Sequence, residues 1–163
     1  MNGRILLACI AILTASCSGS DYTQPVDAAG NYTGQVTNGL SSCPGVWVTG
    51  AMADVQITVA QTGQNVSLRA EGGGALILQA EFGTTSFNGS INGSHVDALI
   101  IGSRMAMSGA CVYTMNGQLS ADLNGNTMTG SITYTPQTNN NADCTSGGVT
   151  GCARSQTFTL TRQ

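Results

Sequence analysis

Few residues in this sequence have the types and spacing that chemistry requires. The single histidine, His95, is followed two residues later by Asp97, and in a strand both side chains point to the same face. A carboxylate that orients a histidine forms part of a general-base arrangement, so the pair is a candidate for a hydrolase. No G-x-S-x-G motif occurs, and the many serines leave no particular one as the nucleophile. We therefore predict a non-catalytic protein, with this pair as polar surface residues and a hydrolase as an alternative.

The other candidate site residues do not indicate a function more clearly. The only glutamates, Glu71 and Glu81, flank an expected hairpin around Gly72-Gly73-Gly74, and this separation is too long for a glycosidase pair. We interpret both as surface charges. Trp47, the only tryptophan, is either a ligand-stacking residue or a core residue, and joins the His95–Asp97 pair as a candidate binding residue. No C-x-x-C spacing occurs, so the sequence predicts no metal site, and the chain is long enough for a core without a cofactor.

The composition narrows the class of protein. The chain has 163 residues, which fits one domain, and only 8 % of them are charged. It contains no lysine, and its five arginines are scattered, which argues against a nucleic-acid-binding protein. Glycine is abundant and proline rare, and threonine, serine and asparagine are frequent. This balance is typical of an exported all-β domain with many tight turns.

The N-terminus has the features of an export signal. Arg4 precedes an apolar run of ten residues, Ile5–Thr14, which is about half the length that a membrane-spanning helix needs. The run is followed by Ala15-Ser16-Cys17, and residues 13–17 (LTASC) resemble the lipobox of bacterial lipoproteins. The resemblance implies that residues 1–16 are a signal peptide and that Cys17 is acylated as the new N-terminus. An ordinary signal peptide cleaved near Ser16, with Cys17 unmodified, is the alternative.

The resemblance also implies a location. Ser18 stands where an aspartate would retain a lipoprotein at the inner membrane, so we expect the outer membrane of the cell envelope. Residues 17–30 then form the lipid-bearing cysteine and a flexible tether, and residues 31–163 a single β domain. Removal of Arg4 with the signal takes the net charge from −3 to −4, which disfavours nucleic acid and anionic headgroups as partners. The membrane is thus a partner through the lipid alone.

The remaining cysteines indicate an oxidising compartment. Of the six cysteines, Cys9 lies in the expected signal and Cys17 is the expected lipid-bearing residue, which leaves four in the domain, as expected for two disulfides with three possible pairings. Cys144 and Cys152 enclose a glycine-rich loop that closes easily. We therefore predict the pairs Cys144–Cys152 and Cys43–Cys111.

The body of the chain alternates with the period of a sheet. Val55, Ile57 and Val59 share one face, and residues 111–123 keep a single parity, with a bend or bulge expected at Gly117. Glycines at 63, 93 and 125 recur in similar turns, which reflects either a duplicated hairpin or common turn chemistry. The pattern predicts about ten strands, near residues 31–37, 46–50, 54–61, 65–71, 75–82, 85–92, 95–101, 111–123, 127–135 and 155–162.

Consecutive hairpins favour an antiparallel up-and-down meander that closes into a small barrel, because closure removes exposed strand edges. A two-sheet sandwich is the alternative. Inward positions mix Gly34, Gly89, Gly117 and Gly130 with larger apolar residues, as a tapering interior requires. We therefore expect a lipid-anchored β-barrel that serves binding or envelope structure, and an exported inhibitor of a protease or lysozyme is a further alternative.

Overall fold

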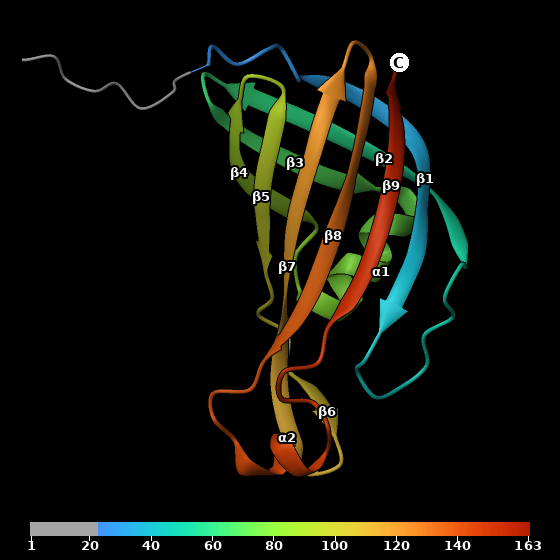
Figure 1. The fold of residues 1–163 in the computed structure, drawn as a ribbon, viewed down its shortest axis with the longest axis vertical. Coiled ribbons are helices and arrows are strands. Elements are labelled where there is room, and N and C mark those ends of the chain that lie inside the picture. The colour runs from blue at the N-terminus through green and yellow to red at the C-terminus, as the bar shows by residue number, and fades with distance from the viewer. Residues whose placement is uncertain (1–22) are drawn as a thin grey trace, which may run out of the picture.

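The structure is a computed structural model that describes residues 23–163 and consists mainly of antiparallel strands (Figure 1). The strands are β1 (Gly30–Ser41), β2 (Met52–Thr62), β3 (Asn65–Glu71), β4 (Ser86–Asn92), β5 (His95–Ile101), β6 (Ala106–Ser108), β7 (Cys111–Asn124), β8 (Thr127–Gln137) and β9 (Arg154–Arg162). The helices are α1 (Gly72–Phe82) and α2 (Ala142–Ser146). Neither helix in this part of the chain has the length and apolar character of a membrane-crossing segment.

Eight of the strands form a closed antiparallel barrel. Their order is β5-β4-β3-β2-β1-β9-β8-β7, and β5 also pairs with β7, which closes the ring. Strand β6 is an addition that pairs only with the beginning of β7, outside the ring. The all-β class and the closed barrel are confirmed, and the two-sheet sandwich is wrong because β5 and β7 leave no open edge.

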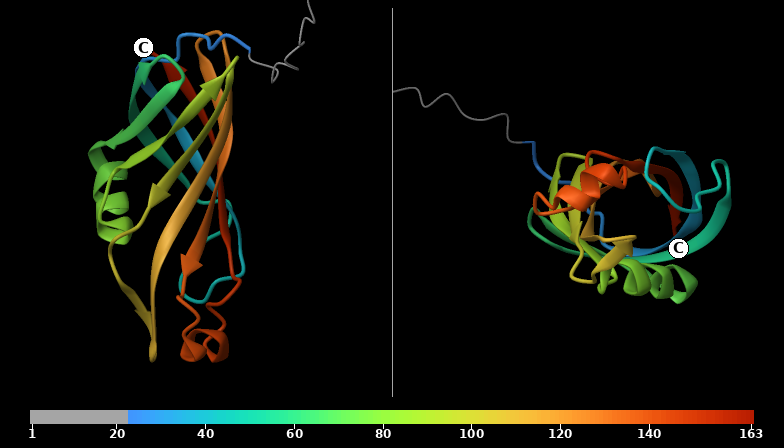
Figure 2. Two further views of the ribbon diagram at one scale, coloured as in Figure 1. Left: turned by 90° about the vertical axis from the view of Figure 1, so that its left-hand side faces the viewer. Right: turned by 90° about the horizontal axis from the view of Figure 1, so that it is seen from below.

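The two ends of the barrel differ. At one end, the hairpins β2–β3, β4–β5 and β7–β8 turn through Gly63, Gly93 and Gly125, whose φ angles of 59°, 58° and 59° suit glycine. At the other end lie the β1–β2 loop, α2 and β6, whereas α1 lies along the side of the barrel between the two ends, as Figures 1 and 2 show. We call these the turn end and the loop end.

Several inward-facing glycines allow the strands to approach closely. A Cβ at Gly89 would lie 1.9 Å from the carbonyl oxygen of Asp97, and a Cβ at Gly34 would lie 2.0 Å from that of Thr159. Of the bend or bulge expected at Gly117, the bulge is wrong, because β7 pairs with β8 without a register shift from Thr114 to Asn124. Gly117 instead leaves space for the Tyr134 ring on β8. The mixture of glycines and larger side chains inside the barrel thus allows the strands to pack at the spacing that the closed barrel requires.

Two of the expected strands are absent from the described chain. Residues 75–82 belong to α1, because the side chains that turn toward the core, Leu78 and Phe82, have the i, i+4 spacing of a helix. Gly83 ends this helix in the left-handed conformation, with φ 75°. Residues 46–50 lie in the loop between β1 and β2 rather than in a strand. The hairpin expected around Gly72-Gly73-Gly74 is accordingly the beginning of a helix.

The four cysteines form two disulfides, but the predicted pairing is wrong. Cys43 pairs with Cys152, and Cys111 pairs with Cys144. Antiparallel pairing of β1 with β9 continues to Ser41 and Arg154, so the residues just beyond these strand ends meet. Helix α2 meanwhile directs Cys144 toward the beginning of β7, away from Cys152. Both disulfides therefore fix the loop end.

Candidate functional site

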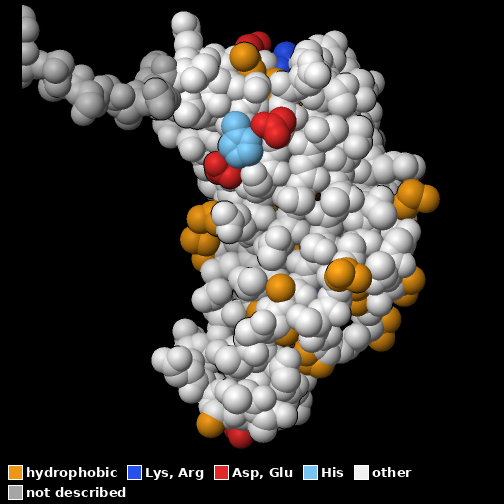
Figure 3. Space-filling view, in the orientation of Figure 1, with side chains coloured by type: hydrophobic (Ala, Val, Ile, Leu, Met, Phe, Trp, Pro, Cys, Tyr) orange, Lys and Arg blue, Asp and Glu red, His pale blue; other side chains and the backbone are white. Residues whose placement is uncertain are grey.

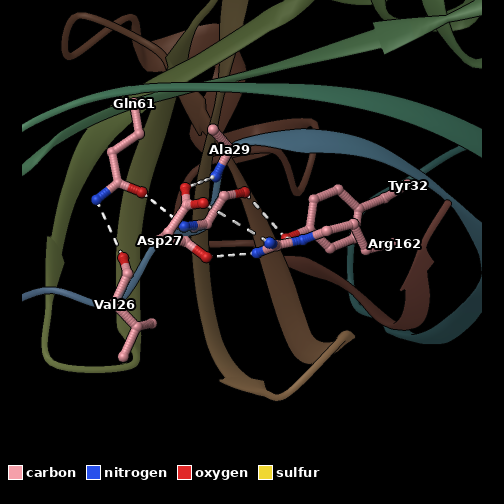
Figure 4. A network of polar contacts seen from close by, with 7 residues as sticks. Val26, Asp27, Ala29, Tyr32, Gln61 and Arg162 are labelled. Carbon is pink, nitrogen blue, oxygen red and sulfur yellow. Dashed lines mark hydrogen bonds and ion pairs between the residues drawn. The ribbon is translucent and has the colours of Figure 1, made fainter.

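A polar network closes the turn end of the barrel (Figure 4). Tyr32 Oη donates to the carbonyl of Ala28 at 2.9 Å and accepts from Arg162 Nε at 3.0 Å, and Arg162 also donates to the carbonyl of Asp27. Gln61 holds the same segment, since its Oε1 accepts from Ala28 N at 2.7 Å and its Nε2 donates to Val26 O at 3.1 Å. Ala28 and Tyr32 are fully buried as a result.

This network shortens the expected tether. Thr23 already contacts the β4–β5 turn, because its N donates to Asn92 Oδ1 at 3.1 Å and its carbonyl accepts from Gly93 N at 3.2 Å. Residues 23–29 thus pack across the barrel instead of linking it flexibly. Cys17 and the expected signal peptide, residues 1–16, lie outside the described residues.

The loop end contains a cavity of about 280 Å³. Its inner wall is mainly apolar and includes Val36, Ile57, Phe87 and Ile132 from the barrel strands and Phe82 from α1. Its mouth lies between the beginning of β2 and α1, where the lining residues Met52, Ile77 and Glu81 are exposed. Eight-stranded barrels are just wide enough to be filled by side chains or to hold one small ligand, and here the turn end is filled and the loop end hollow.

A chain of polar side chains crosses the wall of this cavity. Tyr134 Oη donates to Gln156 Oε1 at 2.8 Å, Gln156 Nε2 donates to Asn38 Oδ1 at 2.8 Å, and Asn38 Nδ2 donates to Val48 O at 3.2 Å. All three side chains line the cavity. Burial raises the pKa of the Tyr134 hydroxyl, and the negative charge of Glu81 raises it further, so the phenol stays protonated. An apolar cavity with a few convergent polar groups is the usual form of a small-molecule site.

Trp47 lies at the edge of the cavity, which places it among the possible ligand contacts. Its Nε1 donates to the carbonyl of Gly39 at 2.9 Å, and the guanidinium carbon of Arg154 lies 5.4 Å from the centre of its ring. Arg154 Nη2 donates to Pro44 O at 2.9 Å, whereas its buried Nε has no hydrogen-bond partner. Trp47 is thus a half-buried residue of the cavity wall that Arg154 holds in place.

The histidine pair lies elsewhere, on the outer face of β5 near the turn end. His95 Nε2 is 3.4 Å from Asp97 Oδ2 and 3.2 Å from Ser120 Oγ, and His95 Nδ1 is 2.8 Å from Asp122 Oδ1. Figure 3 shows the imidazole between two carboxylates on an open surface. None of these four residues lines the cavity. The two-residue spacing in the sequence predicts that Asp97 lies beside His95. Ser120 and Asp122 reach His95 only because β5 pairs with β7, and no local sequence pattern indicates that pairing.

A second hollow on the barrel differs from the loop-end cavity in its lining. A wider hollow of about 430 Å³ lies on the outside, between β1, β2 and the beginning of α1, and its lining includes Asp54, Gln56 and Glu71. This polar hollow lacks the aromatic and apolar wall of the loop-end cavity, so we favour the cavity. Within the same residues, no group of three His, Cys, Asp or Glu side chains is arranged to hold a metal ion.

Sequence reasoning missed Glu81, Tyr134 and Gln156 as site residues. The pattern placed Glu81 on a strand as a surface charge, whereas α1 brings its side chain to the mouth of the cavity. No family model, curated protein or solved structure matches the chain. What the loop end offers chemically is a small apolar chamber with hydrogen-bonding groups on one wall.

Proposed function

We propose that this protein is a lipid-anchored, non-catalytic envelope protein that binds a small apolar molecule in its loop-end cavity. The observation that carries the proposal is the cavity itself, with a satisfied polar chain from Tyr134 to Asn38 in an otherwise apolar wall. Its volume of about 280 Å³ is somewhat under twice the roughly 150 Å³ of a cavity known to accept benzene. A ligand with one ring and a short chain fits this size.

The lipid anchor supports the same function by orienting the barrel. Cys17, the expected acylation site, lies only six residues before Thr23, and Thr23 is hydrogen-bonded to the turn end. With so short a connection, the turn end faces the membrane and the mouth of the cavity faces away from it. The outer membrane, inferred from Ser18, remains part of this proposal.

The test uses Trp47 as an internal probe, because it is the only tryptophan and lines the cavity. Titration of the domain with 4-phenyl-1-butanol is expected to change the Trp47 emission in a saturable way. Gly74→Leu should weaken this binding at least about tenfold, since a Cβ at Gly74 points at Val55 and Ala70 at ordinary contact distances of 3.7 and 3.9 Å and the rest of the leucine fills the cavity.

Gly73→Leu is the matched control. The same substitution one residue earlier gives α1 the same rise in helix propensity, but a Cβ at Gly73 meets no atom within 4 Å and the residue does not line the cavity. Binding should therefore persist in this variant. A saturable signal that both variants retain would contradict binding in the cavity, and a lack of any saturable signal in the unmodified domain would contradict the function.

One observation favours a second candidate, a hydrolase. Ser120, His95 and Asp122 have the hydrogen-bond order of nucleophile, base and orienting carboxylate. The side chains of His95 and Asp122 are 45 % and 70 % exposed, however, whereas such catalysis gains its strength in a water-excluded site. Hydrolysis of p-nitrophenyl acetate that disappears in both His95→Ala and Ser120→Ala would support this candidate, and unchanged turnover would remove it.

A further inference from the structure

We propose that the loop-end cavity selects ligands that carry a protonated amine on a small apolar body, and that Glu81 at the mouth holds the amine. This inference rests on the proposed function and adds the charge of the ligand to it. Three independent properties of the cavity point to a cation: the charge of its lining, the polarity of its hydrogen-bonding groups, and its aromatic rings.

The first property is the charge of the lining. Glu81 is the only charged residue among those that line the cavity. The ion pairs of residues 23–163 join Arg69 to Glu71, His95 to Asp97 and Asp122, and Arg162 to Asp27, so none of them neutralises Glu81.

Two arginines lie near the cavity without lining it. Arg104 borders, with Glu81, a separate hollow that Met115 also lines, and Arg154 contacts the Trp47 ring and donates to Pro44 O. Inside the cavity, the charge that acts on the Tyr134 hydroxyl besides burial is that of Glu81. Glu81 therefore carries the only formal charge on the lining itself, and this charge favours a cationic ligand over an anionic one.

The second property is the polarity of the hydrogen-bonding groups. The only proton of the Tyr134 hydroxyl is donated to Gln156 Oε1, and the only N–H of the Trp47 ring is donated to Gly39 O. The Tyr134 oxygen can therefore only accept a further hydrogen bond, as can the carboxylate of Glu81. An ammonium group has donors and no acceptor, so it matches these two oxygens. Gln156 and Asn38 each keep one N–H, through which a hydroxyl ligand can also bind, but neither of these groups distinguishes an amine from an alcohol by charge.

The third property is the set of aromatic rings. Trp47, Phe82, Phe87 and Tyr134 all line the cavity, and the rings of Phe82 and Tyr134 lie 5.4 Å apart at 41°. The negative faces of such rings attract a desolvated cation, and they also pack well against an apolar body. A carboxylate at the mouth with aromatic rings behind it is thus complementary to an arylalkylamine or a compact alkylamine.

The experiment compares three probes with one body and three head groups, 4-phenylbutylamine, 4-phenyl-1-butanol and 4-phenylbutyrate, by Trp47 emission and by calorimetry at pH 7. An alkylamine is protonated at this pH, as the lysine side chain is. We expect the amine to bind about tenfold more tightly than the alcohol, and the carboxylate to bind more weakly than either. In Glu81→Gln the affinity for the amine should fall to that for the alcohol, while the affinity for the alcohol is retained.

Glu71→Gln is the matched control, because it removes the only other glutamate, which pairs with Arg69 and does not line the cavity. The preference for the amine should survive in this variant, which separates a local effect of Glu81 from a change in net charge. Equal binding of amine and alcohol by the unmodified domain, or a preference that Glu81→Gln leaves intact, would overturn the charge inference alone. Absence of binding by all three probes would overturn the proposed function as well.

Discussion

His95 on β5 lies directly opposite Asp122 on β7, and its Nδ1 is 2.8 Å from Asp122 Oδ1, at the strand pair that closes the barrel. The hydrogen bond to Asp122 raises the pKa of His95 above its ordinary value of 6.5, partial burial opposes this, and the charge of Asp97 adds to the rise. The protonated imidazole thus links the two strands that complete the ring. This side chain has a structural explanation that does not require catalysis.

The raised pKa predicts a dependence of stability on pH. Because the folded protein holds the proton of His95 more tightly than the unfolded chain, the contribution is complete below pH 6.5 and is lost as the pH rises through the folded pKa. The pair is exposed, so we expect an effect of about 0.2–1 kcal/mol. Urea unfolding at pH 5.5 and pH 8.5 should show this loss in the unmodified domain and not in His95→Gln.

The variants Asp122→Asn and Asp97→Asn compare how much each carboxylate raises the pKa of His95. Because the hydrogen bond to Asp122 is the largest contribution, Asp122→Asn should lower the pKa of His95 more than Asp97→Asn does, as measured by NMR titration of the imidazole. The opposite order would show that the contact across the strands is not the dominant one.

Cleavage after methionine without reduction distinguishes the observed pairing from one that joins Cys144 to Cys152. Cuts after Met52, Met115 and Met128 place Cys43, Cys111 and the Cys144–Cys152 segment on separate fragments. The pairs Cys43–Cys152 and Cys111–Cys144 should hold all three fragments together until a reductant is added. Release of the fragment with Cys144 and Cys152 before reduction would contradict this pairing.

The two disulfides should also differ in their effect on stability. Cys43 and Cys152 are 109 residues apart, whereas Cys111 and Cys144 are 33 apart. In the chain-entropy description, closing these loops stabilises the folded state by about 5 and about 4 kcal/mol. Replacing both Cys43 and Cys152 by serine should therefore lower the urea midpoint of unfolding more than replacing both Cys111 and Cys144.

The barrel was accessible to sequence reasoning because its signals are local. Alternation at Val55, Ile57 and Val59 marks one face of β2, and the turn glycines mark the hairpin tips, so consecutive pairing followed directly. The sequence of helix α1 resembles that of a strand, because its apolar run at Leu76, Ile77 and Leu78 has no clear period, and only the pair of Leu78 and Phe82 indicates a helix.

The candidate site was harder to predict because its parts are distant in sequence. Tyr134, Gln156 and Asn38 lie on three neighbouring strands, and their hydrogen bonds depend on the registers of β8 with β9 and of β9 with β1. Such registers are set by the closed ring and not by any local pattern. The disulfide pairing failed for the same reason, since easy closure of a short loop was outweighed by the meeting of the ends of β1 and β9.

Two inward glycines should differ in their tolerance of alanine. A Cβ at Gly89 would lie 1.9 Å from the backbone oxygen of Asp97, whereas a Cβ at Gly117 would lie 2.7 Å from Ile100 Cγ2 and 2.8 Å from Tyr134 Cδ1, which are side-chain atoms. Side chains shift more easily than a paired strand, so we expect a loss of about 1–3 kcal/mol for Gly117→Ala and a larger one for Gly89→Ala. The urea midpoints of the two variants show which substitution destabilises the barrel more. Equal midpoints would show that the strands separate readily at Gly89.

The proposed lipid anchor predicts how the location of the protein and its binding of a ligand are related. In Cys17→Ser the protein should leave the membrane fraction, and retention there would contradict the lipoprotein interpretation. A chain of six residues spans at most about 20 Å when extended, and Thr23 is bound to the turn end, so the proposed anchor at Cys17 would keep the loop end away from the bilayer. The Kd for 4-phenylbutylamine should therefore be the same for the anchored protein in vesicles and for the soluble Cys17→Ser protein. Markedly weaker binding by the anchored form would show that the membrane covers the mouth of the cavity.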